Sequence, residues 1–278
     1  ETLSDIIEFI GIENILNANE WAHKFQNHTL KSNQICLTFD DALKSQVDIA
    51  LPKLRSNGLT GFFFIYSSIF EGVKEKLEIY RYFRTTQFSS IDDFYEVFSN
   101  YLKKSPISNK IQNKLKNFNS TEYLKNFTFY SKSDKKFRYI RDQILKEEEY
   151  FTIMDTLIQE SKINLEKIYK NLWISEKDLK KINKEGHVIG LHSYSHPTNF
   201  SALSYKNQNE EYIKNKKHLE KITPEIFTMS HPSNSYNLDT LKILKNLGIT
   251  MGFRADMNPI KSNLEIPRQD HSIITSML

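Results

Sequence analysis

Apolar and polar positions alternate along the chain in blocks that predict strands and helices in turn. The run "ICLTF" (35–39) predicts a buried strand, and "SQVDIALPKLRSNGL" (45–59) predicts a helix that ends at Asn57-Gly58. The run "TGFFFIYSS" (60–68) predicts a second strand. A strand, a helix and another strand in this order are typical of a parallel pair joined by a crossover helix.

The pattern changes over about residues 71–170, which are rich in Lys, Asn, Phe and Tyr. Helical periods such as "SIDDFYEVFSNYLKK" (90–104) and "YFTIMDTLIQESKI" (150–163) predict that this segment is a mostly helical insertion. We therefore expect a single domain over residues 1–278 that contains a long helical insertion.

After the insertion the alternation of strands and helices resumes. The segment "SEKDLKKINKEG" (175–186) predicts a helix, with Ser175 and Asp178 as a capping box and Gly186 at its end. "LDTLKILKNLGI" (238–249) predicts another helix. Strands are predicted at "HVIGL" (187–191), "EIFTMS" (225–230), "TMGFR" (250–254) and "LEIPR" (264–268). This alternation predicts an α/β fold, a parallel barrel or sheet.

Composition narrows the class of protein. The 278 residues are 39% hydrophobic, enough to bury a large core, and 38 Lys and Arg face 34 Asp and Glu. The net charge of +4 is spread along the chain, so nucleic acid is not an expected partner. The single cysteine, Cys36, excludes an intrachain disulfide. The opening segment has neither the basic start nor the apolar run of a signal peptide, and no stretch predicts a transmembrane helix. We expect a soluble chain, cytoplasmic or periplasmic; its oligomeric state is unknown.

The motif "HSYSH" (192–196) places two histidines four residues apart after an apolar run. On a helical turn, positions i and i+4 project from one face, so both imidazoles can reach one metal ion. Taken alone, the pair is equally well explained by hydrogen-bonded core histidines.

The adjacent carboxylates Asp40 and Asp41 follow the first predicted strand and favour the metal site over core histidines. A hydrolytic zinc site typically has three protein ligands and an open position for water, and that water still needs a nearby base to accept its proton. Two histidines and one aspartate supply the ligands, and the other aspartate supplies the base. The alternative is a strand-end turn or a helix N-cap, for which Asp is common.

These residues resemble the NodB-like polysaccharide deacetylases, carbohydrate esterase family four. "TFDD" (38–41) is similar to the family's first motif, "HSYSH" to its second, and "FTMSHPSNSYN" (227–237), with Pro232, lies where the third is found. The resemblance implies a distorted (β/α) barrel and metal-dependent removal of N-acetyl groups from amino sugars of a polysaccharide or glycan precursor. It implies Asp40 as the catalytic base, and as ligands of a divalent metal, with zinc expected, Asp41, His192 and His196.

The sequence departs from the family pattern in the first and third motifs, and in the third motif Ser233 and Asn234 stand at its aromatic and glycine positions. Ala42 stands where the family usually has glycine, a mild change because alanine fits most backbone regions other than those with positive φ. Ser230 stands where the third motif often carries an arginine that holds the catalytic base. We expect either Arg254 or Arg268 to replace that arginine; otherwise the base is poorly oriented and activity is low.

The family also uses a histidine as general acid. His271 is the expected counterpart, and His231 is the second candidate. Asp256, Arg268 and Asp270 are expected to surround the site and fix its histidines or its base. Tyr236, Tyr194 and Trp173 adjoin the motifs and are candidates for stacking on sugar rings, with core packing as the alternative for Trp173.

Other functions use parts of the same pattern. A hydrolase of a non-sugar amide or formamide would keep the site and change the substrate. A carbohydrate-binding protein with a degraded site would explain the missing arginine, but four intact site residues argue against it. A glycosidase with paired carboxylates fits poorly. Its two carboxyl groups flank the glycosidic bond about 5 Å or more apart, and acids adjacent in sequence are badly placed for this.

Overall fold

The protein divides into two compact units. The computed structural model describes residues 2–125, 130–275 and 277–278. Glu1–Lys74 and Asn171–Leu278 form the first unit, and Glu75–Lys170 form the second.

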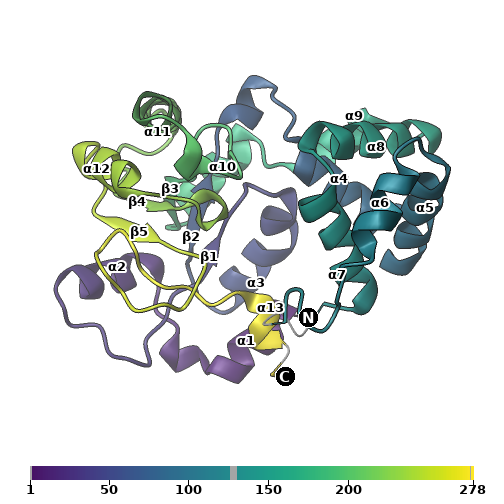
Figure 1. Cartoon of the computed structure of the whole chain (residues 1–278). Helices are drawn as coiled ribbons and strands as arrows, with labels where there is room; N and C mark the ends of the chain where they lie inside the picture. The colour runs from purple at the N-terminus through teal and green to yellow at the C-terminus, as the bar shows by residue number, and fades with distance from the viewer. Residues whose placement is uncertain (1, 126–129, 276) are drawn as a thin grey trace. The chain divides into compact units, whose positions relative to one another are not determined.

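The first unit is built on one parallel sheet whose strands follow chain order (Figure 1). Neighbouring strands pair in register, as Phe63 does with Ile189 and Ile65 with Leu191. Parallel strands need long connections, which here contain helices or the second unit. The predicted α/β class with a parallel sheet is confirmed. The five strands are β1 (Thr38–Phe39), β2 (Phe62–Ile65), β3 (Val188–Leu191), β4 (Thr228–Ser230) and β5 (Met251–Phe253).

The helices of the first unit include several that the sequence predicts. Ser175 and Asp178 form the expected capping box at the start of α10, and Gly186, with φ of 84°, follows its end. The predicted first helix begins as a π-helix, Gln46–Ala50, and continues as α3. The helices are α1 (Thr2–Ile10), α2 (Ala18–Gln26), α3 (Leu51–Ser56), α10 (Glu176–Lys184), α11 (Tyr205–Leu219), α12 (Leu238–Asn246) and α13 (His271–Thr275).

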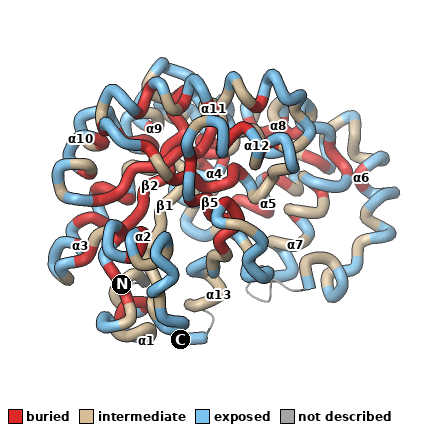
Figure 2. The backbone as a smooth tube through the Cα atoms, turned by 90° about the vertical axis from the view of Figure 1, so that its left-hand side faces the viewer, coloured by how far each residue is buried: buried red, intermediate tan, exposed pale blue. Residues whose placement is uncertain are grey.

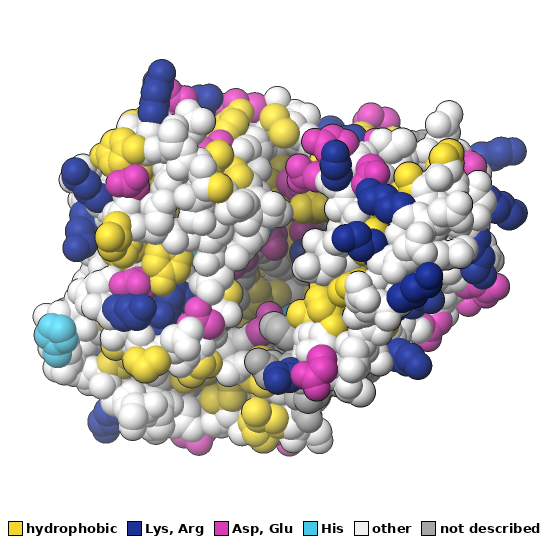
Figure 3. All heavy atoms as spheres, in the orientation of Figure 1, with side chains coloured by type: hydrophobic (Ala, Val, Ile, Leu, Met, Phe, Trp, Pro, Cys, Tyr) yellow, Lys and Arg dark blue, Asp and Glu magenta, His cyan; other side chains and the backbone are white. Residues whose placement is uncertain are grey.

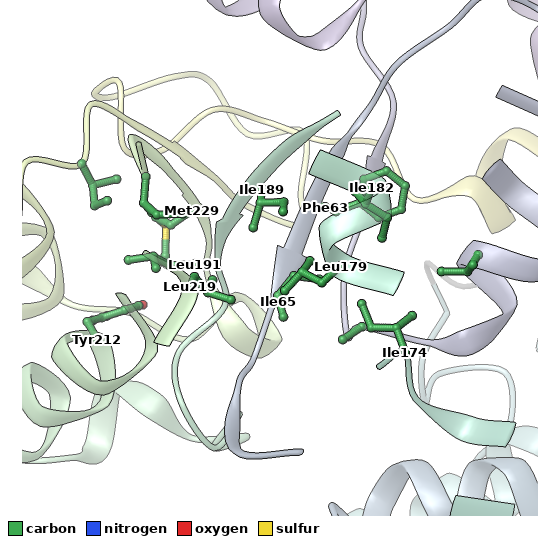
Figure 4. Packing of buried hydrophobic residues seen from close by; sticks show 14 of the residues in the cluster. Phe63, Ile65, Ile174, Leu179, Ile182, Ile189, Leu191, Tyr212, Leu219 and Met229 are labelled. Carbon is green, nitrogen blue, oxygen red and sulfur yellow. The ribbon is translucent and has the colours of Figure 1, made fainter. Parts of the chain in front are cut away.

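The core of the first unit lies on both faces of the central strands, which are buried (Figure 2). Side chains alternate along a strand, so one face of β2 and β3 differs from the other. One face carries Phe63, Ile65, Ile189 and Leu191, which pack with residues of α10 and α11 (Figure 4). The opposite face carries Phe62, Phe64 and Val188, which pack with Trp21 and Phe253.

The strands are shorter than the segments that predict them, and two predicted strands lose most of their length. Within 35–39, only Thr38 and Phe39 form β1, and the segment is half-buried rather than buried. The reason is its position, because β1 pairs with β2 alone in the described sheet. In "LEIPR", Ile266 makes a single bridge to Phe253. Pro267 has no N–H with which to extend the pairing.

The second unit is helical over its described residues, and the helices predicted at 90–104 and 150–163 appear as α5 and α8. Its interior is aromatic: the ring of Phe94 contacts those of Phe83, Phe98 and Phe137. The helices are α4 (Lys76–Thr86), α5 (Ile91–Lys104), α6 (Ser108–Leu115), α7 (Lys132–Tyr139), α8 (Glu147–Glu160) and α9 (Leu165–Leu172), the last of which ends in the first unit.

The surface carries charges of both signs. On the face in Figure 3, Lys and Arg side chains are interspersed with Asp and Glu. Over the described ranges, no helix is both long enough and apolar enough to cross a bilayer.

Candidate metal and catalytic site

The carboxyl ends of the strands bring distant parts of the sequence together. Asp40 and Asp41 follow β1, His192 follows β3, and Ser230 ends β4. The carboxyl ends of parallel strands lie at one edge of a sheet, where α/β proteins usually place their sites. The side chains of Asp40, Asp41, His192 and Ser230 meet at this edge.

Asp41, His192 and His196 converge closely enough to hold one metal ion. The Oδ1 atom of Asp41 lies 3.3 Å from Nε2 of His192 and 3.4 Å from Nε2 of His196. Two ligands bound at about 2.0–2.2 Å in tetrahedral geometry lie about 3.3–3.6 Å apart. The separations therefore fit a shared ion, and the side chain of Asp41 is 20% exposed.

The hydrogen bonds of His192 prepare its Nε2 for a metal. The carbonyl oxygen of Ser230 can only accept, so Nδ1 of His192, 2.9 Å away, carries the hydrogen and donates it. In the neutral imidazole the lone pair then lies on Nε2, which is 3.3 Å from Oδ1 of Asp41. Burial would lower the pKa of His192, but Asp40 and Asp41 outweigh burial, so the pKa is raised. Protons therefore compete for this nitrogen, and metal affinity should fall as the pH falls.

Asp40 is held by a bidentate ion pair with Arg268. Nη1 of Arg268 donates to Oδ1 of Asp40, and Nη2 donates to Oδ2, both at 2.8 Å. Ser230, where the family often has arginine, donates through Oγ to Oδ2 of Asp40 at 3.1 Å. Of the two arginines expected to replace the missing one, Arg268 therefore binds Asp40, and it does so from the segment that follows β5.

Arg254 is connected to Asp40 through Arg268. Its carbonyl oxygen accepts a hydrogen bond from Nε of Arg268 at 2.6 Å, whereas its guanidinium bonds the carbonyl oxygen of Asn258. Thr38 accepts from Nη1 of Arg268 at 3.1 Å. The fork of Arg268 is thus fixed from two sides before it meets Asp40.

The ion pair sets the charge of Asp40. Burial would raise the pKa of Asp40, but Arg268 and then His192 outweigh burial, and the pKa lies below its usual value. Asp40 therefore remains ionised, able to accept a proton, to a lower pH than an isolated aspartate.

In the Arg268→Gln variant, Asp40 should become protonated at a higher pH than in the wild type. Without the guanidinium, burial dominates and the pKa of Asp40 rises, so the acid limb of the kcat/KM profile should move up by roughly 1–3 pH units, the effect of a neighbouring opposite charge. Arg55→Gln, which removes an exposed ion pair with Glu185, is the control and should leave the limb in place. A uniform loss of rate with an unmoved acid limb would contradict this role for Arg268.

The backbone at the acid pair corrects one expectation from the sequence. Asp41 has φ of 75° and Ala42 has φ of 53°, and Ala42 is completely buried. Replacement of the family glycine by Ala42 is therefore not mild, because the left-handed region costs an alanine about 1–2 kcal/mol. The strain lies next to a candidate metal ligand.

The Ala42→Gly variant should be more stable than the wild type. Relief of the strain exceeds the roughly 0.4–1 kcal/mol that glycine costs through the unfolded chain, so we expect a gain of about 0.5–1 kcal/mol in the free energy of unfolding. Chemical denaturation would measure it, with Ala50→Gly, at a right-handed helical position, as a control that should lose stability. An unchanged or lower stability for Ala42→Gly would show that its buried methyl group outweighs the strain.

His231, the second candidate for the general acid, is buried among structural contacts. Its Nε2 lies 2.8 Å from the carbonyl oxygen of Leu264 and therefore donates a hydrogen, and its ring stacks on Tyr236 at 4.1 Å. Burial lowers the pKa of His231 to about 4. Tyr236 in turn donates to Glu265 at 3.0 Å. This geometry favours a structural role for both rings.

His271 and Asp270 lie at the exposed start of α13. The side chain of His271 is 74% exposed, and its Nδ1 lies 3.5 Å from Oδ1 of Asp270. The Asp270 carboxylate accepts from the backbone N–H and the hydroxyl of Ser272. Asp256 accepts from Asn234 at 2.7 Å. The structure thus joins Arg268 to Asp40, whereas Asp270 bonds its own turn and Asp256 bonds Asn234 of the loop after β4.

Aromatic residues flank the second histidine. The ring of Tyr66 lies 5.5 Å from that of His196, and the indole of Trp173 donates to the hydroxyl of Tyr66. Both aromatic residues are buried, so Trp173 packs in the core and touches the site through Tyr66. Tyr194 instead points its hydroxyl to Glu71, at 2.7 Å.

The sequence analysis missed two residues of α11 that bond the histidine loop, Glu211 and Asn215. A signal is present, because Ser204 caps the helix and the buried positions Gln208, Tyr212 and Leu219 recur at helical spacing. The segment "YKNQNEEYIKNKKHL" (205–219) is otherwise strongly polar, which obscures the pattern.

Comparison with known proteins agrees with this geometry. Residues 140–252 match the polysaccharide deacetylase family, a range that includes both histidines and Ser230. No curated protein sequence matches the chain. The resemblance to polysaccharide deacetylases indicated by the motifs is confirmed.

Solved structures share the fold at low sequence identity. The BpsB deacetylase domain from Bordetella bronchiseptica has a TM-score of 0.55 and 12% identity, over 96% of this chain and 83% of that chain. A de-N-acetylase from Aggregatibacter actinomycetemcomitans has a TM-score of 0.52 and 12% identity, over 99% of this chain and 86% of that chain. The Streptococcus pyogenes deacetylase PplD, in complex with acetate, has a TM-score of 0.51 and 15% identity, over 91% of this chain and 72% of that chain. The fold is that of the NodB-like deacetylases.

Proposed function

We propose that this protein is a metal-dependent carbohydrate N-deacetylase that removes acetyl groups from an amino sugar in a polysaccharide or glycan precursor. We further propose that residues 1–278 form one catalytic domain with 75–170 as its insertion. The observation that carries the proposal is the convergence of Asp41, His192 and His196 beside an aspartate held by Arg268. Metal ligands and a separate, oriented base are two parts that metal-dependent hydrolysis of an amide uses.

The donor set suits a divalent ion, with zinc as the proposed metal. Two imidazole nitrogens and one carboxylate oxygen are typical ligands of catalytic zinc. A zinc ion held there would polarise the acetyl carbonyl and lower the pKa of the attacking water. His192 and His196 contribute neutral nitrogens and Asp41 a charge, so the ion would retain positive charge for this task.

Asp40 is proposed as the general base. Its carboxylate lies 3.9 Å from Nε2 of His192 and is fixed by Arg268, so it faces the site without occupying the ligand position of Asp41. As the water oxygen bonds to the carbonyl carbon, an Asp40 oxygen accepts the water proton. The C–N bond then breaks, the amine nitrogen takes a proton, and acetate and the free amino sugar leave.

His271 remains the proposed donor of the amine proton. It follows Arg268 by three residues, so its Cα lies within about 10–11 Å of the residue that binds the base. Its imidazole is exposed and can approach a bound sugar, whereas the hydrogen on His231 is already donated to Leu264.

Metal analysis combined with acetate release on N-acetylhexosamine oligomers tests the proposal. We expect about one divalent ion per chain, acetate release that stops in chelator, and recovery when zinc is added back. A parallel panel of non-sugar amides and formamides tests the alternative hydrolase. Glycan binding without hydrolysis would instead identify a carbohydrate-binding protein and contradict the enzymatic proposal.

A further inference from the structure

The loop that carries the two histidines has a backbone that needs external support. Between His192 and His196, Ser193 has φ of 61°, and His196 itself has φ of 54°. Left-handed backbone costs non-glycine residues free energy and persists only where surrounding contacts hold it. The question is which contacts fix the loop in the conformation that brings both imidazoles to Asp41.

Glu211 of α11 supplies three of these contacts. Its Oε2 accepts from the backbone N–H groups of Tyr194, at 3.0 Å, and Ser195, at 2.8 Å. Its Oε1 accepts from the hydroxyl of Ser195 at 2.7 Å. Successive N–H groups next to a left-handed residue form a concave anion site, and here a carboxylate of the same chain fills it.

Asn215 fixes the start of the same loop. Its Oδ1 accepts from the backbone N–H of His192 at 3.1 Å. Its Nδ2 donates to the carbonyl oxygen of Ile65, at the end of β2, and to the hydroxyl of Ser67. Asn215 is completely buried, so loss of any of these bonds would leave a polar group without a partner.

The helix that presents the two residues is itself anchored. Positions i and i+4 lie one above the other on a helix, so Glu211 and Asn215 face the loop together. Tyr212 and Leu219 of α11 are completely buried in the core beside β3 (Figure 4). The pair thus connects the histidine loop to a rigid element, as accurate metal sites require.

We propose that Glu211 and Asn215 are positioning residues that hold the loop of His192 and His196 in its metal-binding conformation. The inference rests on the proposed metal-dependent function. In this proposal α11 does more than pack against the core. The Glu211 carboxylate stabilises the loop and thereby controls how closely the two imidazoles would approach one metal ion. Neither residue would touch the metal or the substrate.

The test measures binding of cobalt(II) to the full chain after metal removal, by titration calorimetry and by the visible absorption spectrum at saturating cobalt. Glu211→Ala removes all three bonds, and we expect cobalt affinity to fall by about 10–100-fold, the usual effect of losing an outer partner of a ligand. The spectrum should change as well, since the ligands are less well oriented. A residue that only stabilised the fold would lower the melting temperature and leave affinity and spectrum unchanged.

Two variants serve as matched controls. In Glu211→Gln the amide oxygen can still accept both backbone N–H groups, and its NH₂ can donate to the Ser195 hydroxyl, so affinity and spectrum should be close to wild type. Glu210→Ala removes the exposed neighbouring carboxylate, which faces Lys206, and should have no effect. If Glu211→Ala does not fold, Ser195→Ala removes one of the three bonds and should weaken cobalt binding to a smaller extent.

The outcomes separate the two proposals. A wild-type protein that binds no cobalt would contradict the metal-dependent function, and the positioning role with it. A wild type that binds cobalt, beside a folded Glu211→Ala or Ser195→Ala variant of equal affinity and identical spectrum, would overturn the positioning role alone.

Discussion

The Asp41→Ala variant is expected to lose bound metal and deacetylase activity together. Asp41 is the only carboxylate among the three residues that converge in the described structure, and its Oδ1 lies between two histidine nitrogens. Removing a direct ligand should weaken metal binding by more than the roughly 10–100-fold that an outer partner is worth. Added zinc should restore part of both properties, because two histidines remain to bind it.

Metal content by elemental analysis and acetate release would be measured on the same samples. Asp48→Ala is a matched control, since Asp48 is an exposed aspartate of the adjacent π-helix that pairs with Lys44. It should retain both metal and activity. Full metal content in Asp41→Ala would exclude Asp41 as a ligand and return it to the alternative role of a strand-end turn residue.

The central residues of the site could be predicted because their chemistry is local in sequence. Asp40 and Asp41 are adjacent, and His192 and His196 are four apart, so short motifs record the arrangement. The strands that carry the motifs are also readable, as "HVIGL" becomes β3 with Val188–Leu191. A parallel sheet then places both strand ends at one edge without further information.

The partner of the base could not be predicted, because it depends on tertiary geometry. Arg254 and Arg268 both follow short apolar runs, and each was a reasonable replacement for the arginine missing at Ser230. The choice depends on which guanidinium reaches Asp40 in the folded chain. Arg268 and Asp40 are 228 residues apart in sequence, so only the tertiary structure shows that they meet. Spacing along the chain does not contain it.

The supports of the histidine loop were hidden for a different reason. Glu211 and Asn215 belong to a strongly polar helix in which acids and amides are also common on solvated faces. The backbone N–H groups they bind have no sequence signature, because every residue except proline carries one. The cost of Ala42 could not be predicted either, because its positive φ is a property of the folded backbone and has no signature in the sequence.

The Asp40→Asn variant is expected to keep its metal and lose its activity, in contrast to Asp41→Ala. Asparagine preserves the size of the side chain and can still accept from Ser230 or Arg268, so the ligand residues should stay in place. What it lacks is an oxygen basic enough to accept the proton of the attacking water, and loss of a general base typically costs about 10²–10⁴ in rate. Excess zinc should not restore this loss.

Metal content, acetate release and the melting temperature of Asp40→Asn would be compared with those of Asp41→Ala. The melting temperature is needed because Arg268, whose side chain is only 14% exposed, loses its charged partner in Asp40→Asn. A folded Asp40→Asn protein that loses its metal, beside an Asp41→Ala protein that keeps it, would reverse the two roles. If both folded variants keep metal and full activity, neither acid takes part in hydrolysis and the deacetylase proposal fails.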